Sequence, residues 1–205
     1  MDILSILSTE IAKGIINTGI EGPYDAVSSS TAGDYPSMGC SQWEGPRGDY
    51  LLSWIDGGNQ FTGRTYSDIV NCGQLATLKQ LLGSEQGRAA QVAILTEDCK
   101  KYVQILQQVA TLDDTRCLIY AGMWCPTNHY VVKRFLENRE GKYNLRSLST
   151  LRDLFRDQYY IAANVGETYA TGYANRAQIT YEYVAGIDLT TPYGIPAYGE
   201  AGNWR

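Results

Sequence analysis

Residues 19–44 read GIEGPYDAVSSSTAGDYPSMGCSQWE, and they give the strongest indication of the architecture. A helical pattern ends at Gly19, so Glu21 follows the C-terminal end of a helix. Residues 22–45 are then rich in Gly, Pro, Ser and Asp, which favours turns and short strands over a helix. We therefore expect Glu21 to be held at the junction between a helix and a small β region, a place where a carboxyl can be fixed against an apolar wall.

Most of the remaining sequence has the periodicity of helices. Apolar residues recur at helical spacing over about residues 2–18, and a second helix is expected from Pro46 to Gly57. A series of helical segments then follows, at about residues 67–82, 84–95, 97–110, 113–123, 127–139, 147–163 and 167–184. The predicted fold class is α+β and predominantly α, with one small β region at about residues 22–45 between the first helix and a helical lobe.

Two short polar segments within this series are typical of helix starts. Thr96-Glu97-Asp98 and Asp113-Asp114-Thr115 both place capping residues next to acidic side chains of a first turn. We expect a new helix to begin at each of them.

The domain organisation is expected to be simple. A chain of 205 residues can bury one substantial core, and it contains no internal repeat. We expect one domain over residues 1–186. Residues 187–205 are rich in Gly, Pro and Tyr without a helical period, so they are expected to form a tail that either packs back on the domain or docks on a partner.

Composition excludes several classes of function. The formal net charge is −5 and no Lys/Arg cluster is present, which argues against nucleic-acid binding. Five cysteines without a Cys-x-x-Cys pair favour reduced, mostly buried thiols. With His129 as the only histidine, no metal site and no cofactor are expected. The N-terminal segment reads as an amphipathic helix, not as a signal peptide, and no apolar stretch is long enough to span a membrane.

A glutamate followed at this spacing by Gly-x-x-Gln-Trp resembles the front segment of phage and clostridial peptidoglycan hydrolases of the lysozyme-like superfamily. The matching residues are Glu21, Gly22, Tyr24, Val27, Ser37, Gly39, Gln42, Trp43, Arg47, Leu51 and Leu52. Residues 81–91 are similar to a Leu-Leu-x-x-x-x-Gly-x-x-Ala-Gln helix of that family, and 118–120 and 128–130 to two further segments. The similarity spans about residues 3–184. Departures are Pro23 and the apolar segment 123–126, where relatives are more polar.

The resemblance implies a lysozyme-like fold and a muramidase that cuts the β-1,4 bond between MurNAc and GlcNAc, with Glu21 as general acid. Glu44 or Asp34 is the candidate second carboxylate. Either could activate a water in an inverting hydrolase if the two carboxyl groups stand roughly 6.5–9.5 Å apart. If both are turn-capping acids instead, Glu21 could act alone as acid and then base in a lytic transglycosylase.

Five further residues are candidates for substrate binding on the same resemblance. Ser37 and Gln42 would bond sugar acetamido groups, and Tyr24 or Trp43 would form a stacking wall, although Trp43 could equally be core. Tyr130 occupies a place from which some relatives bond the acid, and packing on a helix face is its alternative. His129 reads as a surface or satisfied histidine.

The expected partner is the glycan strand of peptidoglycan. The protein would be made in the cytoplasm of a bacterial host without a signal peptide. It would reach the wall as a phage endolysin after holin-type release, or as part of a virion, where the tail of the chain could contact a phage tail or other assembly. The alternative is a non-catalytic structural or glycan-binding tail protein. Retention of Glu21 with Gln42 and two more acids favours the enzyme.

Overall fold

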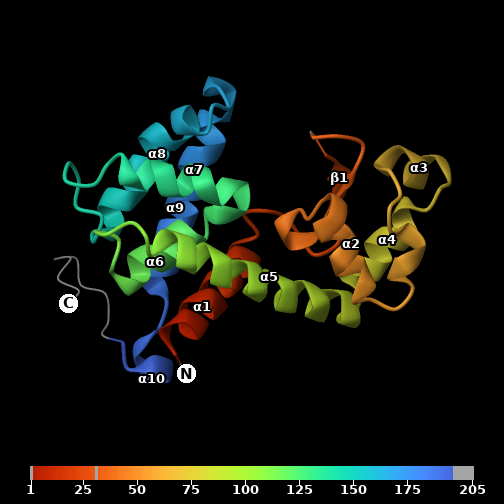
Figure 1. The fold of residues 1–205 in the computed structure, drawn as a ribbon, viewed down its shortest axis with the longest axis horizontal. Coiled ribbons are helices and arrows are strands. Elements are labelled where there is room, and N and C mark those ends of the chain that lie inside the picture. Colours follow the sequence, from red (N-terminus) through yellow and green to blue (C-terminus); the bar gives the residue numbers. More distant parts are fainter. Residues whose placement is uncertain (1, 31, 196–205) are drawn as a thin grey trace. The chain divides into compact units, whose positions relative to one another are not determined.

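The computed structural model describes residues 2–30 and 32–195 and is predominantly helical (Figure 1). The helices are α1 Ile3–Thr18, α2 Gly45–Ser53, α3 Tyr66–Asn71, α4 Leu75–Gly83, α5 Glu85–Leu106, α6 Thr115–Gly122, α7 Cys125–Glu137, α8 Leu148–Ala162, α9 Ala170–Gly186 and α10 Thr190–Tyr193. Single 3₁₀ turns lie at Gly39–Ser41, Gly58–Phe61 and Glu167–Tyr169. The strands β1 Val27–Ser29 and β2 Pro36–Met38 form an antiparallel pair. The predicted α+β class, with its small β region inside residues 22–45, is confirmed.

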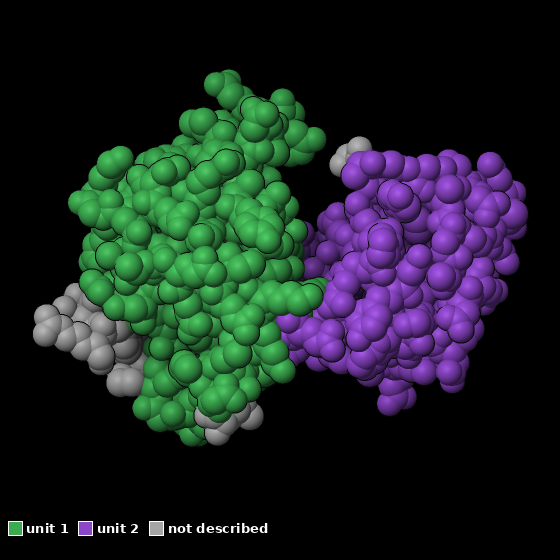
Figure 2. Space-filling model, viewed as in Figure 1, with its two compact units in different colours: residues 1–14, 98–205 green, residues 15–97 purple. Residues whose placement is uncertain are grey.

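The chain divides into two compact units, which Figure 2 shows in different colours. Unit 1 comprises residues 1–14 and 98–205, and unit 2 comprises residues 15–97. The chain passes from one unit to the other within α1 and again within α5. In the part of the chain that the structure describes, no helix is both long and apolar enough to cross a membrane.

Unit 2 is built around the β1–β2 hairpin. Val27 pairs with Met38 and Ser28 with Ser37. Helix α2 packs against β2, and α3 and α4 pack against β1. Helix α2 lies close to the hairpin at Gly48, where a Cβ would lie 2.7 Å from Cε of Met38 and 3.3 Å from the Trp43 carbonyl oxygen. Three helices thus pack against a hairpin whose strands have only three residues each.

Unit 1 is a helical core in which α8 and α9 pack along each other and α6 contacts both. Its centre is an aromatic cluster: the ring centroid of Phe155 lies 4.6 Å from that of Trp124, 4.9 Å from that of Phe135 and 5.1 Å from that of Tyr159. The apolar segment 123–126 is thus explained by burial, since Trp124 is fully inaccessible to solvent.

One of the two predicted helix starts is correct and the other is wrong. The carboxylate of Asp114 caps α6 by accepting a hydrogen bond from the Cys117 backbone N–H at 2.9 Å. Thr96, by contrast, lies inside the continuous helix α5, and its hydroxyl donates to the Val92 carbonyl one turn back at 2.8 Å. A threonine hydroxyl can satisfy itself in this way within a helix, so Thr-Glu-Asp does not by itself start a new one.

The predicted helix over residues 67–82 is interrupted. Helix α3 ends at Asn71, and Gly73 adopts the left-handed conformation (φ +69°) before α4 begins at Leu75. Glycine reaches this conformation at little cost, which is why the chain can turn here.

The described part of the C-terminal segment packs back on unit 1. Leu189 is fully buried, and the Tyr193 hydroxyl donates to the Glu10 carboxylate at 2.8 Å. Residues 190–193 form the short helix α10, so the expectation of a segment without helix is wrong there. Of the predicted tail, residues 196–205 lie outside the described residues.

Four of the five cysteines (Cys40, Cys99, Cys117 and Cys125) are buried, as expected, and Cys72 is exposed; no disulfide joins any of the five. Burial raises the pKa of the Cys40 thiol to about 12 and also raises the pKa values of Cys117 and Cys125.

Because the thiolate is the reactive form, we expect one fast-reacting thiol in the native protein, that of Cys72. Titration with a chromogenic disulfide at pH 8 should count one thiol, and Cys72→Ser should remove it. A second fast thiol in the native state would contradict this assignment.

Candidate active site

Glu21 lies between two glycines whose backbone turns the chain out of α1. Gly19 adopts φ +62° and Gly22 adopts φ +133°, and the Gly22 N–H donates to the Gly19 carbonyl at 3.2 Å. The Glu21 side chain is half-buried, and its Oε1 atom is fully buried. The expected position at a helix end, next to the small β region, is therefore observed within unit 2.

Gln42 fixes the loop that carries Glu21. Its side-chain Nε2 donates to the Glu21 backbone carbonyl at 2.7 Å. Gln42 itself is left-handed (φ 51°, ψ 48°), one of only two non-glycine residues with positive φ among those described. A non-glycine residue in this region carries a backbone cost of about 1 kcal/mol or more, and such positions concentrate at functional sites. The bond to Glu21 is a role for Gln42 that the sequence did not suggest.

Gln91 of α5 joins three segments of unit 2 from within. Its Oε1 accepts a hydrogen bond from the Cys40 N–H at 2.9 Å. Its Nε2 donates to the carbonyls of Tyr24, at 3.1 Å, and of Leu82, at 3.0 Å. The side chain is fully buried. One amide therefore ties α5 both to the segment after Glu21 and to the turn before Gln42.

The sequence indicates Gln91 only as part of the 81–91 segment and does not reveal its structural role. The available signal was a polar residue inside the buried stripe of α5, between Ala90 and Ile94. A buried polar side chain needs hydrogen-bond partners, and these could have been sought among the loops.

Gly39 lies directly after β2, where the Gln91 side chain meets the hairpin, and this position requires a glycine. Its φ is +73°, and an added Cβ would lie 2.3 Å from Oε1 of Gln91. We expect Gly39→Ala to lower the free energy of unfolding by about 2 kcal/mol, from backbone strain and the displaced amide together. Urea denaturation measures the loss. Gly73→Ala is the matched control, since its φ is +69° and nothing lies within 4 Å of the added Cβ. Equal losses in both variants would contradict a role for the Gln91 contact.

The predicted binding residues of the hairpin region lie together. The Ser37 hydroxyl is buried and donates to the Gln42 carbonyl at 3.4 Å. Trp43 exchanges backbone hydrogen bonds with Met38 and is only 5% exposed, in agreement with the alternative that it is core. Tyr24 is half-buried, and the Arg88 guanidinium lies 5.7 Å from its ring centroid. Tyr24 and Gln42 therefore present more surface to a ligand than Ser37 and Trp43 do.

The two candidate second carboxylates both make structural hydrogen bonds. Glu44 precedes α2, and its Oε2 accepts from the buried Ser30 hydroxyl at 2.6 Å. Asp34 is exposed in the hairpin turn, and its Oδ1 accepts from the backbone N–H and the hydroxyl of Ser67, at 3.1 and 3.0 Å. Asp34 thus links the hairpin turn to α3, which matches the alternative of a capping acid.

The remaining two residues lie in unit 1, on α7. Tyr130 is 68% exposed, and its ring centroid is 4.2 Å from that of His129. Burial lowers the pKa of His129. Tyr130 is therefore mostly exposed, and its ring contacts that of its neighbour His129 on the same helix.

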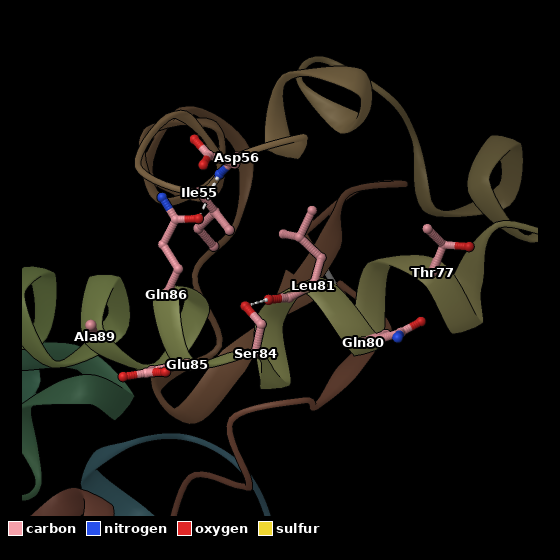
Figure 3. A pocket seen from close by; sticks show the side chains of 9 residues that line it. All are labelled: Ile55, Asp56, Thr77, Gln80, Leu81, Ser84, Glu85, Gln86 and Ala89. Atoms are coloured by element: carbon pink, nitrogen blue, oxygen red, sulfur yellow. Dashed lines mark hydrogen bonds between the residues drawn. The ribbon is translucent and has the colours of Figure 1, made fainter.

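Two hollows flank α4 in unit 2. The larger, of about 750 Å³, is lined by side chains of α4, of the start of α5 and of the segment after α2 (Figure 3). Its wall is held by Gln86, whose Oε1 accepts from the Asp56 N–H at 3.1 Å. The other hollow, of about 450 Å³, is lined by Pro23, Tyr24, Asp25, Lys79, Gln80, Gly83 and Arg88. Its first lining residue, Pro23, follows Glu21 by two positions in the sequence.

No group of three or more His, Cys, Asp or Glu residues that could hold a metal ion occurs among the described residues. Comparisons of the chain with protein-family models, with curated proteins and with solved structures find no match.

Proposed function

We propose that the chain is a peptidoglycan-cleaving glycosidase of lysozyme-like fold, in which Glu21 is the general acid for the bond between MurNAc and GlcNAc. The observation that carries the proposal is the fixation of Glu21. The Gln42 side chain donates a hydrogen bond of 2.7 Å to the backbone carbonyl of Glu21, and the Oε1 atom of Glu21 is buried. Gln91 holds the carbonyl of Tyr24, three residues on, at 3.1 Å. A general acid depends on such fixed placement, because proton transfer requires hydrogen-bond reach.

In a hydrolytic reaction, Glu21 gives its proton to the glycosidic oxygen as the bond from that oxygen to the anomeric carbon breaks. Water attacks the anomeric carbon and loses a proton to a second carboxylate. Glu44 and Asp34 remain the candidates for that base. Each would have to exchange a hydrogen bond to Ser30 or Ser67 for one to the water.

The engagement of both of these acids favours a second candidate reaction, lytic transglycosylation. Here Glu21 again protonates the leaving oxygen, and the resulting carboxylate takes the proton of the muramic sugar's own hydroxyl as that hydroxyl attacks the anomeric carbon. The product is an anhydro sugar and no water is consumed. Glu21 alone suffices for this reaction, with Asp34 and Glu44 left to their structural bonds.

The setting of the proposed activity is a bacterial cell wall, reached as a phage endolysin or as part of a virion. The net charge of −5 supports delivery by a partner, because an acidic protein gains no electrostatic attraction to an anionic wall.

Two carboxylate variants distinguish the reactions. Purified peptidoglycan is digested with wild type, Asp34→Asn and Glu44→Gln, and the products are identified by mass spectrometry. Hydrolysis predicts free reducing muramic ends and a large rate loss in one variant. Transglycosylation predicts anhydro ends and rates in both variants within a few-fold of wild type. If wild type releases neither product from several wall types, the chain is a glycan-binding or structural protein instead.

A further inference from the structure

The charges of unit 2 are distributed unevenly over its surface. Residues 15–97 contain four cationic and nine acidic side chains, a net charge of −5. Two of the four cations are paired: Arg47 with Glu97 at 3.4 Å and Arg64 with Asp68 at 2.6 Å. The other two, Lys79 and Arg88, form no ion pair with any residue that the structure describes, and both line the 450 Å³ hollow beside α4. Although unit 2 is acidic as a whole, both of its cations without an ion pair therefore line the same hollow.

Two contacts hold the Arg88 side chain in a defined position at the hollow. The Arg88 Nε donates to the Gly83 carbonyl at 2.8 Å, and the guanidinium lies over the Tyr24 ring at 5.7 Å from the centroid. These contacts use one N–H group and one face of the guanidinium, and the guanidinium has further donors in its plane. Gln80 adds an amide to the wall. Asp25, which also lines the hollow, leaves a net charge of +1 from three charged side chains.

The neighbouring hollow of Figure 3 provides the contrast. Gln80 lines both hollows, but the larger one contains Asp56 and Glu85 and no cationic side chain. An anionic ligand is therefore favoured on the Lys79–Arg88 side of α4 and disfavoured on the other.

We infer that the hollow formed by Tyr24, Lys79, Gln80 and Arg88 binds a carboxylate of the peptide stems that peptidoglycan strands carry. The inference rests on the proposed function, because it extends the glycan-cleaving site to the peptide attached to the muramic sugar. Tyr24 connects the two: it lines the hollow and follows Glu21 by three residues, and its carbonyl is held by Gln91. Arginine recognises carboxylates through paired donors, and lysine adds a point charge.

The test compares two substrates made from walls freed of teichoic acid: intact peptidoglycan, and glycan strands stripped of peptide by an amidase. We expect wild type to have a lower KM for the peptide-bearing strands. Lys79→Gln and Arg88→Gln should each reduce that preference, and together should reduce it about five- to tenfold, as expected for charge pairs at a partly exposed site. Lys100→Gln, which removes an exposed charge of α5 in unit 1, should keep the preference.

A second arm separates this inference from the proposed function. A soluble stem peptide with a free carboxylate, and the same peptide with that carboxylate amidated, are titrated onto the full chain. We expect the free acid to bind more tightly to wild type and the difference to vanish in the double variant. Equal binding of both peptides by wild type, or an undiminished preference for the free acid in the double variant, would overturn the carboxylate site. If neither glycan is cleaved but the free acid binds selectively, the proposed function fails and the site stands.

Discussion

Glu21→Gln is expected to lower the rate of wall cleavage by between about 10²- and 10⁴-fold, the range that a positioned general acid supplies. The replacement keeps the size of the side chain and removes only the proton that the leaving oxygen would receive. The bond from Gln42 reaches the backbone of residue 21, so it survives the substitution. Initial rates of turbidity loss of a wall suspension measure the effect.

The thermal midpoint of Glu21→Gln should stay close to that of wild type. The lower cleavage rate would then come from the missing acid and not from unfolding. Glu167→Gln is the matched control, because it makes the same replacement at an exposed position in unit 1. A Glu21→Gln protein with more than a tenth of the wild-type rate would exclude Glu21 as the acid.

Gln91→Leu is expected to lower the free energy of unfolding by about 4 kcal/mol, since each buried polar group left without its partner costs roughly 1–3 kcal/mol. The substitution removes the partner of the Cys40 N–H and of the Tyr24 and Leu82 carbonyls, and leucine offers none in return. Because these bonds hold the segments on either side of the site, cleavage should also fall. Urea denaturation gives the stability change.

The same helix supplies the control. Gln86 also makes two side-chain hydrogen bonds, to the Asp56 N–H and the Trp54 carbonyl, but it is exposed, so water can replace its amide. Gln86→Leu should cost no more than about 1 kcal/mol. If Gln91→Leu and Gln86→Leu lower the free energy of unfolding equally, the buried hydrogen bonds of Gln91 do not hold the segments of unit 2 together.

The features that the sequence predicted correctly depend on short-range chemistry. Glycines and prolines around Glu21 end the first helix and allow the hairpin, and Asp114 caps the helix that directly follows it. Such preferences act within a few residues, so they can be read from a single sequence.

The features that were missed depend on contacts between distant residues. The bond from Gln42 to Glu21 spans 21 positions, and those of Gln91 to Cys40 and Tyr24 span 51 and 67. No local pattern determines these pairs. The division into two compact units leaves no local signal either, because its boundaries fall inside α1 and α5, where the helical pattern runs on without interruption.

The proposed glycosidase activity is tested first by digesting purified peptidoglycan with the wild-type chain in water labelled with heavy oxygen and identifying the new ends by mass spectrometry. We expect new muramic ends, each with one labelled oxygen for hydrolysis, or unlabelled anhydro ends for transglycosylation. Digestion that releases peptide termini and no muramic ends, or none of either, would contradict a glycosidase centred on Glu21.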